Sequence, residues 1–314
     1  MNPMGGALQR LRAAEGASLV SASEIDRSPG ARRLDAALLA AACVLFAALY
    51  APVVPGLFRQ WLDDENYRHG LLIPLISALV LWRRRGELRA APAGGGTAAG
   101  AALLALAAVL LIGGTAAAEL FTTRLSLPLY LLGAVLAIRG AHTARIAAPP
   151  ILFLLLMVPL PYIIYYKITF PMQLLSARLS AGALDAIGVS VARRGNILTV
   201  PGYTLEVVAA CSGLRSLMTM FTLALVFALL TGLSWKRKAV LALCAAPVAI
   251  AANTIRLVVT ALGAWAIGPE FADGPLHEAS GLIVFAAGFL LLALCLGILT
   301  WTRPRRNGSQ RSPS

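Results

Sequence analysis

One cysteine stands apart from the other three because small and charged residues surround it. Cys211 lies in Ala210-Cys211-Ser212-Gly213-Leu214-Arg215, at the predicted start of a helix. A helix N-terminus carries a partial positive charge, and Arg215 follows four residues later on the same face. Both features favour the thiolate, which is the form of cysteine that attacks a carbonyl carbon. Cys211 is therefore a candidate nucleophile, with a structural cysteine near the membrane interface as the open alternative.

Two further residues could complete a site for acyl transfer. Arg256 interrupts a segment that is otherwise uncharged from residue 239 to 268, and Asn253 precedes it by one helical turn. His277 opens the last predicted helix and has the pKa range that suits proton transfer. A thiol, a cation for the oxyanion and a histidine together make a cysteine acyl-transfer site. The alternatives are that Arg256 snorkels or pairs with Glu206, and that His277 is an interface residue.

Supporting roles remain open for the neighbouring polar residues. Arg215 could stabilise the Cys211 thiolate or pair with Glu206, and His69 opens another predicted helix on the same side. The sequence contains no zinc-type histidine or cysteine motif, no phosphate-binding loop and no serine nucleophile elbow. We therefore expect neither a metal nor a cofactor.

The composition indicates what must position these residues. The chain has 314 residues, of which 59% are hydrophobic and only 13% are charged, with a mean hydropathy of +0.78. These values exclude an ordinary soluble globule and a disordered chain. Its net charge of +13 would suggest nucleic acid in a soluble protein. In so apolar a chain the excess indicates membrane topology, so we expect membrane lipids and no nucleic acid as partners.

Long uncharged stretches predict the membrane-spanning helices. Six gaps between charged residues hold 17 to 29 uncharged positions, about the length that a membrane helix needs. Two more gaps hold 14 positions, and their flanking arginines could snorkel to the interface. The sequence thus predicts an all-α integral membrane protein with about eight transmembrane helices, between the charged residues at 35–59, 68–83, 89–119, 124–139, 145–167, 215–236, 238–256 and 278–303.

The placement of the basic residues supports this count. With a cytoplasmic N-terminus, 18 of the 27 Lys and Arg residues fall in the predicted inner pieces, as the positive-inside rule requires. Removing either short helix would put basic clusters such as 83–85 and 236–238 on opposite sides. Both termini are therefore predicted to be cytoplasmic. Cys211, Arg256 and His277 then all lie on the outer side.

The chain divides into one membrane domain between two polar tails. We assign residues 1–34 and 302–314 to cytoplasmic tails and 35–301 to the transmembrane domain. Within it, the segment 167–210 connects the fifth and sixth predicted helices on the outer face. Its first part is predicted to be an amphipathic helix on the outer leaflet, and a turn and strand-like residues follow. Because long loops are usually functional or disordered, and this one is apolar, we interpret it as a functional cap.

These motifs resemble the exosortase/archaeosortase family, the multi-pass membrane counterparts of sortases. The resemblance runs from about residue 40 to 300, and a common family form has Ser where this chain has Arg68. The residues that carry it most specifically are Ala210-Cys211-Ser212-Gly213-Leu214-Arg215, Asn253-Thr254-Ile255-Arg256 and His277, with support from Tyr67-Arg68-His69-Gly70 and Pro159-Leu160-Pro161-Tyr162.

The resemblance implies a cysteine protease or transpeptidase in the bacterial inner membrane, with its active site facing the periplasm. Its substrates would be exported proteins with a C-terminal motif such as Pro-Glu-Pro, a transmembrane helix and a basic tail. It would cut near the motif and transfer the protein to a lipid or polysaccharide acceptor, in association with exopolysaccharide production. Cys211, Arg256 and His277 match the family's catalytic positions.

Two other functional classes remain as alternatives. In a multi-pass transporter, Arg256, Asn253 and Glu206 would line a substrate path and Cys211 would be incidental. A transporter predicts charges near the bilayer midplane and internal repeats, whereas the candidate residues gather at one face. A non-catalytic subunit of an exopolysaccharide export system would tolerate the loss of Cys211.

Overall fold

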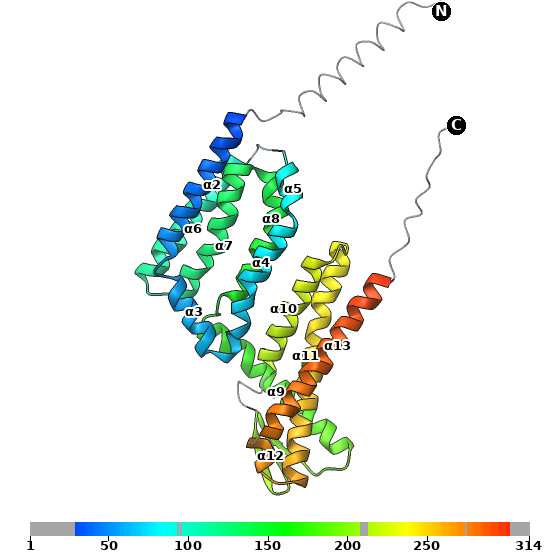
Figure 1. Ribbon diagram of the computed structural model, residues 1–314. Coiled ribbons are helices and arrows are strands. Elements are labelled where there is room, and N and C mark those ends of the chain that lie inside the picture. Colours follow the sequence, from blue (N-terminus) through cyan, green and yellow to red (C-terminus); the bar gives the residue numbers. More distant parts are fainter. Residues whose placement is uncertain (1–28, 93, 95, 208–212, 274, 302–314) are drawn as a thin grey trace, which may run out of the picture.

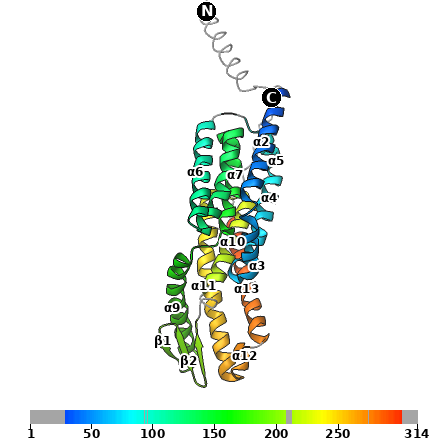
Figure 2. The same ribbon diagram turned by 90° about the vertical axis from the view of Figure 1, so that its left-hand side faces the viewer.

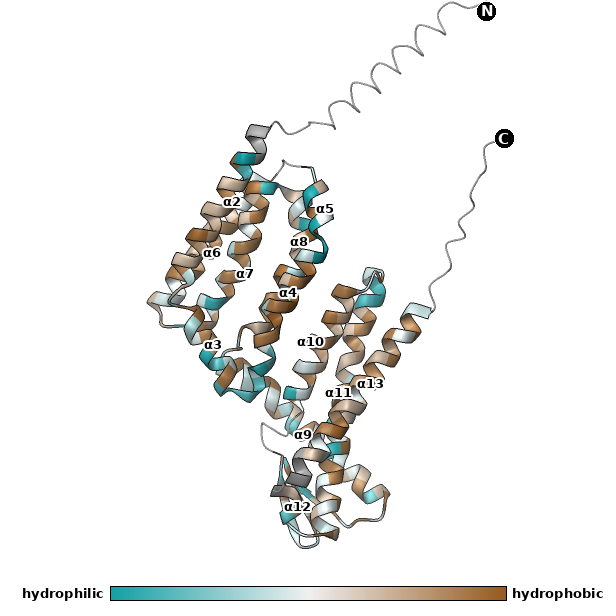
Figure 3. Ribbon diagram, viewed as in Figure 1, coloured by the Kyte–Doolittle hydropathy of each residue, from teal (hydrophilic) through white to brown (hydrophobic). Residues whose placement is uncertain are grey.

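The computed structural model describes residues 29–301 except 93, 95, 208–212 and 274. Its helices form two groups that lie side by side and meet near α4, α9 and α10 (Figure 1). Of the described helices, the first group holds those before residue 160, and the second holds those after it. Brown, apolar residues cover most of the helix surfaces, and teal, polar residues gather at the helix ends (Figure 3).

The N-terminal group consists of seven α-helices and two short 3-10 helices. Two of them, α6 and α7, each have 20 residues and are antiparallel neighbours joined by a tight turn. The bounds are α2 Pro29–Tyr50, α3 Val54–Asp63, η1 Glu65–Leu71, α4 Leu72–Arg83, α5 Arg85–Ala90, α6 Thr97–Ala116, α7 Leu120–Arg139, α8 Ala141–Phe153 and η2 Leu154–Met157.

The C-terminal group combines five α-helices with a small antiparallel sheet of order β1-β2-β3. The sheet and α9 lie beside α11 at one end of the molecule (Figure 2). The bounds are α9 Tyr162–Ala186, β1 Ala192–Arg194, β2 Ile197–Val200, β3 Tyr203–Glu206, α10 Leu214–Leu230, α11 Trp235–Ala266, α12 Glu270–Asp273 and α13 Pro275–Trp301.

The described helices support a membrane protein but do not confirm eight spans. Five are long and apolar enough to cross a membrane, and a bent helix pair raises that number to six. The five candidate spans are Arg33–Tyr50, Thr97–Ala116, Leu120–Arg139, Trp235–Ala266 and Ala279–Trp301.

The three remaining predicted spans differ from a continuous long helix for separate reasons. Helix α4 has only 12 residues and is therefore about 18 Å long, short of a bilayer core of about 30 Å. Helix α10 has 17 residues. Helix α8 with η2 is bent by 82° relative to α9 at residues 158–161, where Pro159 and Pro161 break the helix.

The other short uncharged stretch, between Arg124 and Arg139, belongs to a longer helix. Arg124 lies inside α7, which begins at Leu120. Its side chain is buried, at 4% exposure, and donates a hydrogen bond to the Gln60 side chain of α3. Arg124 therefore does not snorkel to the interface, and α7 reaches 20 residues. A buried, partnered arginine does not end a helix as a solvated one would.

Two of the predicted inner pieces, 83–97 and 139–145, lie together at one end of the N-terminal group. Arg139 lies 3.9 Å from a carboxylate oxygen of Asp35 and donates to the Leu88 carbonyl at 3.1 Å. Arg84 donates to the Ile146 carbonyl at 3.3 Å. These contacts join the start of α2, helix α5, the end of α7 and helix α8, which the charge pattern assigns to the same side.

The outer segment contains the predicted elements, but its helix is oriented differently from the expectation. The buried face of α9 is mostly polar or small, with Thr169, Gln173, Ser176 and Ser180. Its exposed side chains include Leu175 and Leu179. An amphipathic helix lying on the outer leaflet is therefore not confirmed. The expected strand and turn do occur, as β2 and β3 around Pro201-Gly202.

Candidate active site

Two described residues, Val207 and Gly213, hold the ends of the segment that contains the candidate nucleophile. Cys211 itself lies outside the described residues. On its N-terminal side, the Val207 backbone amide donates to the Asn196 carbonyl at 2.9 Å, and Val207 is fully buried. On its C-terminal side, Gly213 precedes α10 with a φ of +85°, which favours glycine. The chain on either side of Cys211 is therefore anchored.

Asn253 of α11 contacts the Cys211 motif directly. A Cβ atom on Gly213 would lie 3.0 Å from the Asn253 side-chain carbon Cγ, so only glycine allows this close approach. Asn253 is buried, and its amide donates to the Ser176 hydroxyl of α9 at 3.1 Å. Asn253 therefore links three elements: the loop before α10, α11 and α9.

Arg256 follows Asn253 by one turn of α11 and contacts α13. A Cβ atom on Gly281 would lie 3.4 Å from Arg256 Nε. Gly281 comes one turn after His277, whose backbone belongs to the first turn of α13. The His277 side chain is outside the described part of the structure. Helix α11 thus places Asn253 against the Cys211 motif and Arg256 against the helix that carries His277.

The partners of Arg215 lie in a distant part of the chain. Its Nη1 lies 2.8 Å from Glu65 Oε2, and its Nε donates to Asn66 Oδ1 at 3.3 Å. Both partners belong to η1, in the N-terminal group. The prediction that Arg215 could pair with Glu206 is therefore wrong. The signal for Glu65 and Asn66 was their position directly before Tyr67-Arg68-His69-Gly70, with two acidic residues ahead of them.

Glu206 lies away from these contacts, on the exposed side of β3. Its carboxylate is 3.5 Å from the side-chain nitrogen of Asn196, which also donates to the Val207 carbonyl at 3.2 Å. Glu206 therefore helps to hold the turn between β1 and β2 against the end of β3. Its contacts with the described residues support the small sheet and do not reach Arg215 or Arg256.

His69 lies in η1, which is packed tightly against η2 and the residues after it. Trp61 Nε1 donates to the Met157 carbonyl at 2.8 Å, and the Leu160 amide donates to the Tyr67 hydroxyl at 3.1 Å. Burial lowers the pKa of His69 from its usual 6.5, although hydrogen bonds with the backbone of neighbouring residues oppose the shift. Burial of His69 therefore favours its neutral form.

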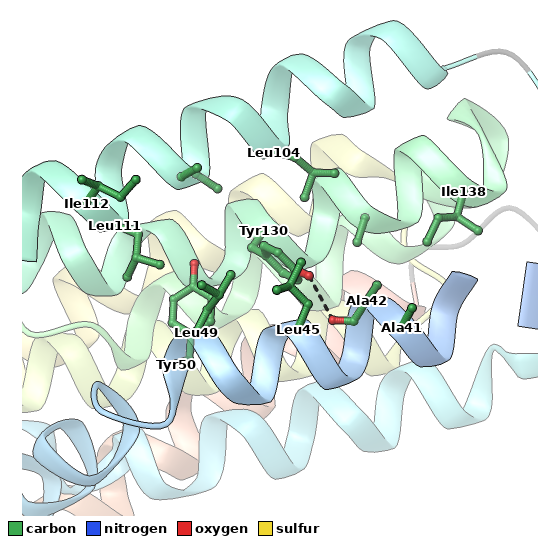
Figure 4. A pocket seen from close by; sticks show the side chains of 13 residues that line it. Ala41, Ala42, Leu45, Leu49, Tyr50, Leu104, Leu111, Ile112, Tyr130 and Ile138 are labelled. Carbon is green, nitrogen blue, oxygen red and sulfur yellow. Dashed lines mark hydrogen bonds between the residues drawn. The ribbon is translucent and has the colours of Figure 1, made fainter. Parts of the chain in front are cut away.

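An apolar cavity lies away from these residues. Its volume is about 390 Å³, and it is walled by α2, α6 and α7 (Figure 4). Both hydroxyl groups in its wall have partners, because Tyr50 pairs with Ser126 at 2.8 Å and Tyr130 donates to the Ala42 carbonyl at 3.0 Å. This wall offers nothing that could activate a peptide bond. Among the described residues, no group of His, Cys, Asp or Glu side chains could hold a metal ion.

The comparison with family models identifies the wider group. The model described as Transmembrane exosortase (Exosortase_EpsH) matches residues 61–294, which is about three quarters of the chain. The chain belongs to the transmembrane exosortase family. The match begins near the end of α3 and ends within α13, so this exosortase carries all the candidate residues inside the family region. Neither the search of curated proteins nor the search of solved structures gave a significant match.

Proposed function

We propose that this exosortase is a membrane-embedded cysteine peptidase or transpeptidase that cleaves a C-terminal sorting signal of exported proteins. The observation that carries the proposal is the pair of contacts made by α11. One joins Asn253 to Gly213, two residues after Cys211, and the other joins Arg256 to Gly281, one turn after His277. Three separate motifs that resemble a family site are thereby neighbours.

The chemistry follows from the three residue types. The Cys211 thiolate attacks the scissile carbonyl carbon, and the guanidinium of Arg256 stabilises the negative charge on its oxygen. His277 donates a proton to the leaving amine as the carbon–nitrogen bond breaks, which leaves a thioester on Cys211. Water or an acceptor nucleophile then attacks the thioester and gives its proton to His277, and the Cys211 thiolate is released.

The proposed topology places this chemistry at the outer face of a bacterial inner membrane. Eight spans with both termini in the cytoplasm account for the basic clusters at one end of the helices. The substrate's own helix would lie beside the enzyme in the bilayer, with its basic tail inside and its short motif outside. The acceptor would be a lipid or polysaccharide at the cell surface.

The test is the processing of a co-expressed exported protein that carries such a signal. We expect Cys211→Ala to abolish processing, because no other group supplies the nucleophile. Cys211→Ser should be almost as inactive, while Cys43→Ala should process the substrate normally. Full processing by Cys211→Ala at normal enzyme levels would overturn the proposed role of Cys211.

A further inference from the structure

A charged and hydrogen-bonded link between the two helix groups holds Arg215. It joins η1, in the N-terminal group, to the second residue of α10, in the C-terminal group. Arg215 is also the last residue of the Cys211 motif. The link therefore connects the part of the chain that carries the proposed nucleophile to a distant part of the membrane domain.

The groups in η1 that accept hydrogen bonds from Arg215 are oriented by contacts that do not involve Arg215. Asp64 Oδ1 accepts hydrogen bonds from both the backbone amide and the side-chain amide of Asn66, each at 2.9 Å. Because its NH₂ group is used in this way, the Asn66 oxygen is directed toward Arg215 Nε. Glu65 supplies a carboxylate oxygen to Nη1. A guanidinium group has a rigid fork of donors, so two acceptors fix its orientation as well as its position.

The platform that carries these acceptors is itself held in place. The Trp61 and Tyr67 hydrogen bonds join α3 and η1 to η2 and to the residues after it. Gly70 lies against the Trp61 ring so closely that a Cβ atom would approach Nε1 to 2.5 Å. A rigid platform transmits its position to the side chain that binds it.

We propose that Asp64, Glu65 and Asn66 form a receptor for the Arg215 guanidinium that positions the Cys211 segment for catalysis. They are positioning residues, since they act through Arg215, and the inference rests on the proposed function. The Arg215 charge is compensated by Glu65 in this arrangement. Arg256 is then the cation that serves the oxyanion, while Arg215 sets where α10 and its preceding loop begin.

The side chains of Arg215 and Glu65 are 33% and 51% exposed, which decides the kind of effect to expect. Ion pairs that are this accessible to water contribute little to folding stability. Misplacement of a catalytic group by about 1 Å, in contrast, can cost about 100-fold in rate. Loss of the pair should thus lower processing much more than it lowers thermal stability.

The experiment is a double-mutant cycle with Glu65→Gln, Arg215→Gln and their combination. We expect each variant to process a co-expressed signal-bearing protein at least about tenfold more slowly, and the double variant to be no slower than either single one. Arg68→Gln is the matched control, because Arg68 lies 3.6 Å from the other oxygen of Glu65 and both residues of this pair belong to η1. It should stay within about twofold of the unmodified enzyme.

A second readout separates this proposal from the proposed function. In a background with Cys43, Cys244 and Cys295 replaced by alanine, the rate at which a membrane-impermeant maleimide labels Cys211 needs no substrate. We expect Glu65→Gln and Arg215→Gln to change this rate by the same factor, at least about threefold, and Arg68→Gln to leave it unchanged. If Cys211→Ala still processes the substrate, the labelling rates alone decide the positioning role.

Two results would overturn the inference. One is a labelling rate and processing rate for Glu65→Gln equal to those of the unmodified enzyme. The other is additive losses in the double variant, which would show that Glu65 and Arg215 act independently. Melting temperatures in detergent provide the fold control: a variant that melts far below the unmodified enzyme is replaced by Arg215→Lys. That variant keeps the charge but loses the bond from Nε to Asn66, and it should be impaired as well.

Discussion

The α6–α7 pair and the region around η1, α10 and α11 are held together by different means. In α6 and α7, glycines allow the backbones to touch: a Cβ atom on Gly100 would lie 2.3 Å from the Ala137 backbone nitrogen, and one on Gly114 would lie 2.6 Å from that of Thr123. Around the candidate site, polar side chains make the contacts between elements. Close apolar packing is indifferent to side-chain chemistry, whereas the polar contacts fix the direction of individual groups.

Because of this difference, the two regions should respond to substitution in separate ways. Changes in the glycine-packed pair should act on folding and leave the activity of each folded molecule intact. Changes in the polar region should act on activity with smaller effects on folding. The following three variants test that separation.

The largest effect should come from Arg256→Gln. Loss of the oxyanion-stabilising cation should lower processing by about 10²–10³-fold, because a donor of this kind acts mainly on the transition state. The measurement is the processed fraction of the co-expressed substrate over time, normalised to the amount of folded enzyme. Arg178→Gln, on the exposed side of α9, is the control and should process normally. Equal activity of the two variants would remove Arg256 from the site.

Gly114→Ala should destabilise the α6–α7 pair without lowering the activity per folded enzyme. The added methyl group would meet Thr123 Oγ1 at 2.5 Å, and overpacking of this kind typically costs about 1–3 kcal/mol. Gly113→Ala is an unusually close control, since nothing lies within 4 Å of its Cβ position. We expect a lower melting temperature for Gly114→Ala only. A drop in specific activity for this variant would break the separation between the two regions.

The smallest expected effect is on the pH dependence of the melting temperature, and it involves His69. Because burial lowers the folded-state pKa of His69, protonation favours the unfolded chain. The stability from neutral His69 is fully present above a pH of about 6.5 and is lost as the pH falls through the folded-state pKa. Between pH 7 and 5, the melting temperature should therefore fall more for the unmodified enzyme than for His69→Gln. Exposed His142, replaced by Gln, is the control, and parallel curves for all three proteins would contradict the prediction.

The sequence predicted the helical membrane class well because length and charge are local properties. It failed where tertiary contacts changed the meaning of a charge or a pattern. The charge pattern predicts a span that begins after Arg124, but Arg124 donates to Gln60 and α7 continues through it. The pattern of α9 predicts a helix lying on the outer leaflet, whereas Ser176 on its polar face accepts a hydrogen bond from Asn253. Neither partner can be identified from residues adjacent in the chain.

The candidate site shows the same division. Its residue types and its family resemblance came from the sequence, because the motifs around Cys211, Arg256 and His277 are read directly from it. The partner of Arg215 did not come from the sequence. Glu65 and Arg215 are 150 residues apart, and Glu206 is much closer to Arg215 in the chain. An ion pair depends on distance in space, and distance along the chain gives little guidance to it.

By itself, the sequence determined that this is an apolar, helical membrane protein of the exosortase family, and which of its residues could perform acyl transfer. Hydrophobic length and charge placement are sufficient for the membrane class, and the family came from the resemblance of its motifs. Only the tertiary structure decided that α11 brings Gly213 and Gly281 next to Asn253 and Arg256, and that η1 holds Arg215. The reason is physical: these contacts require elements from both helix groups to pack within a few ångströms, and packing is a property of the whole fold.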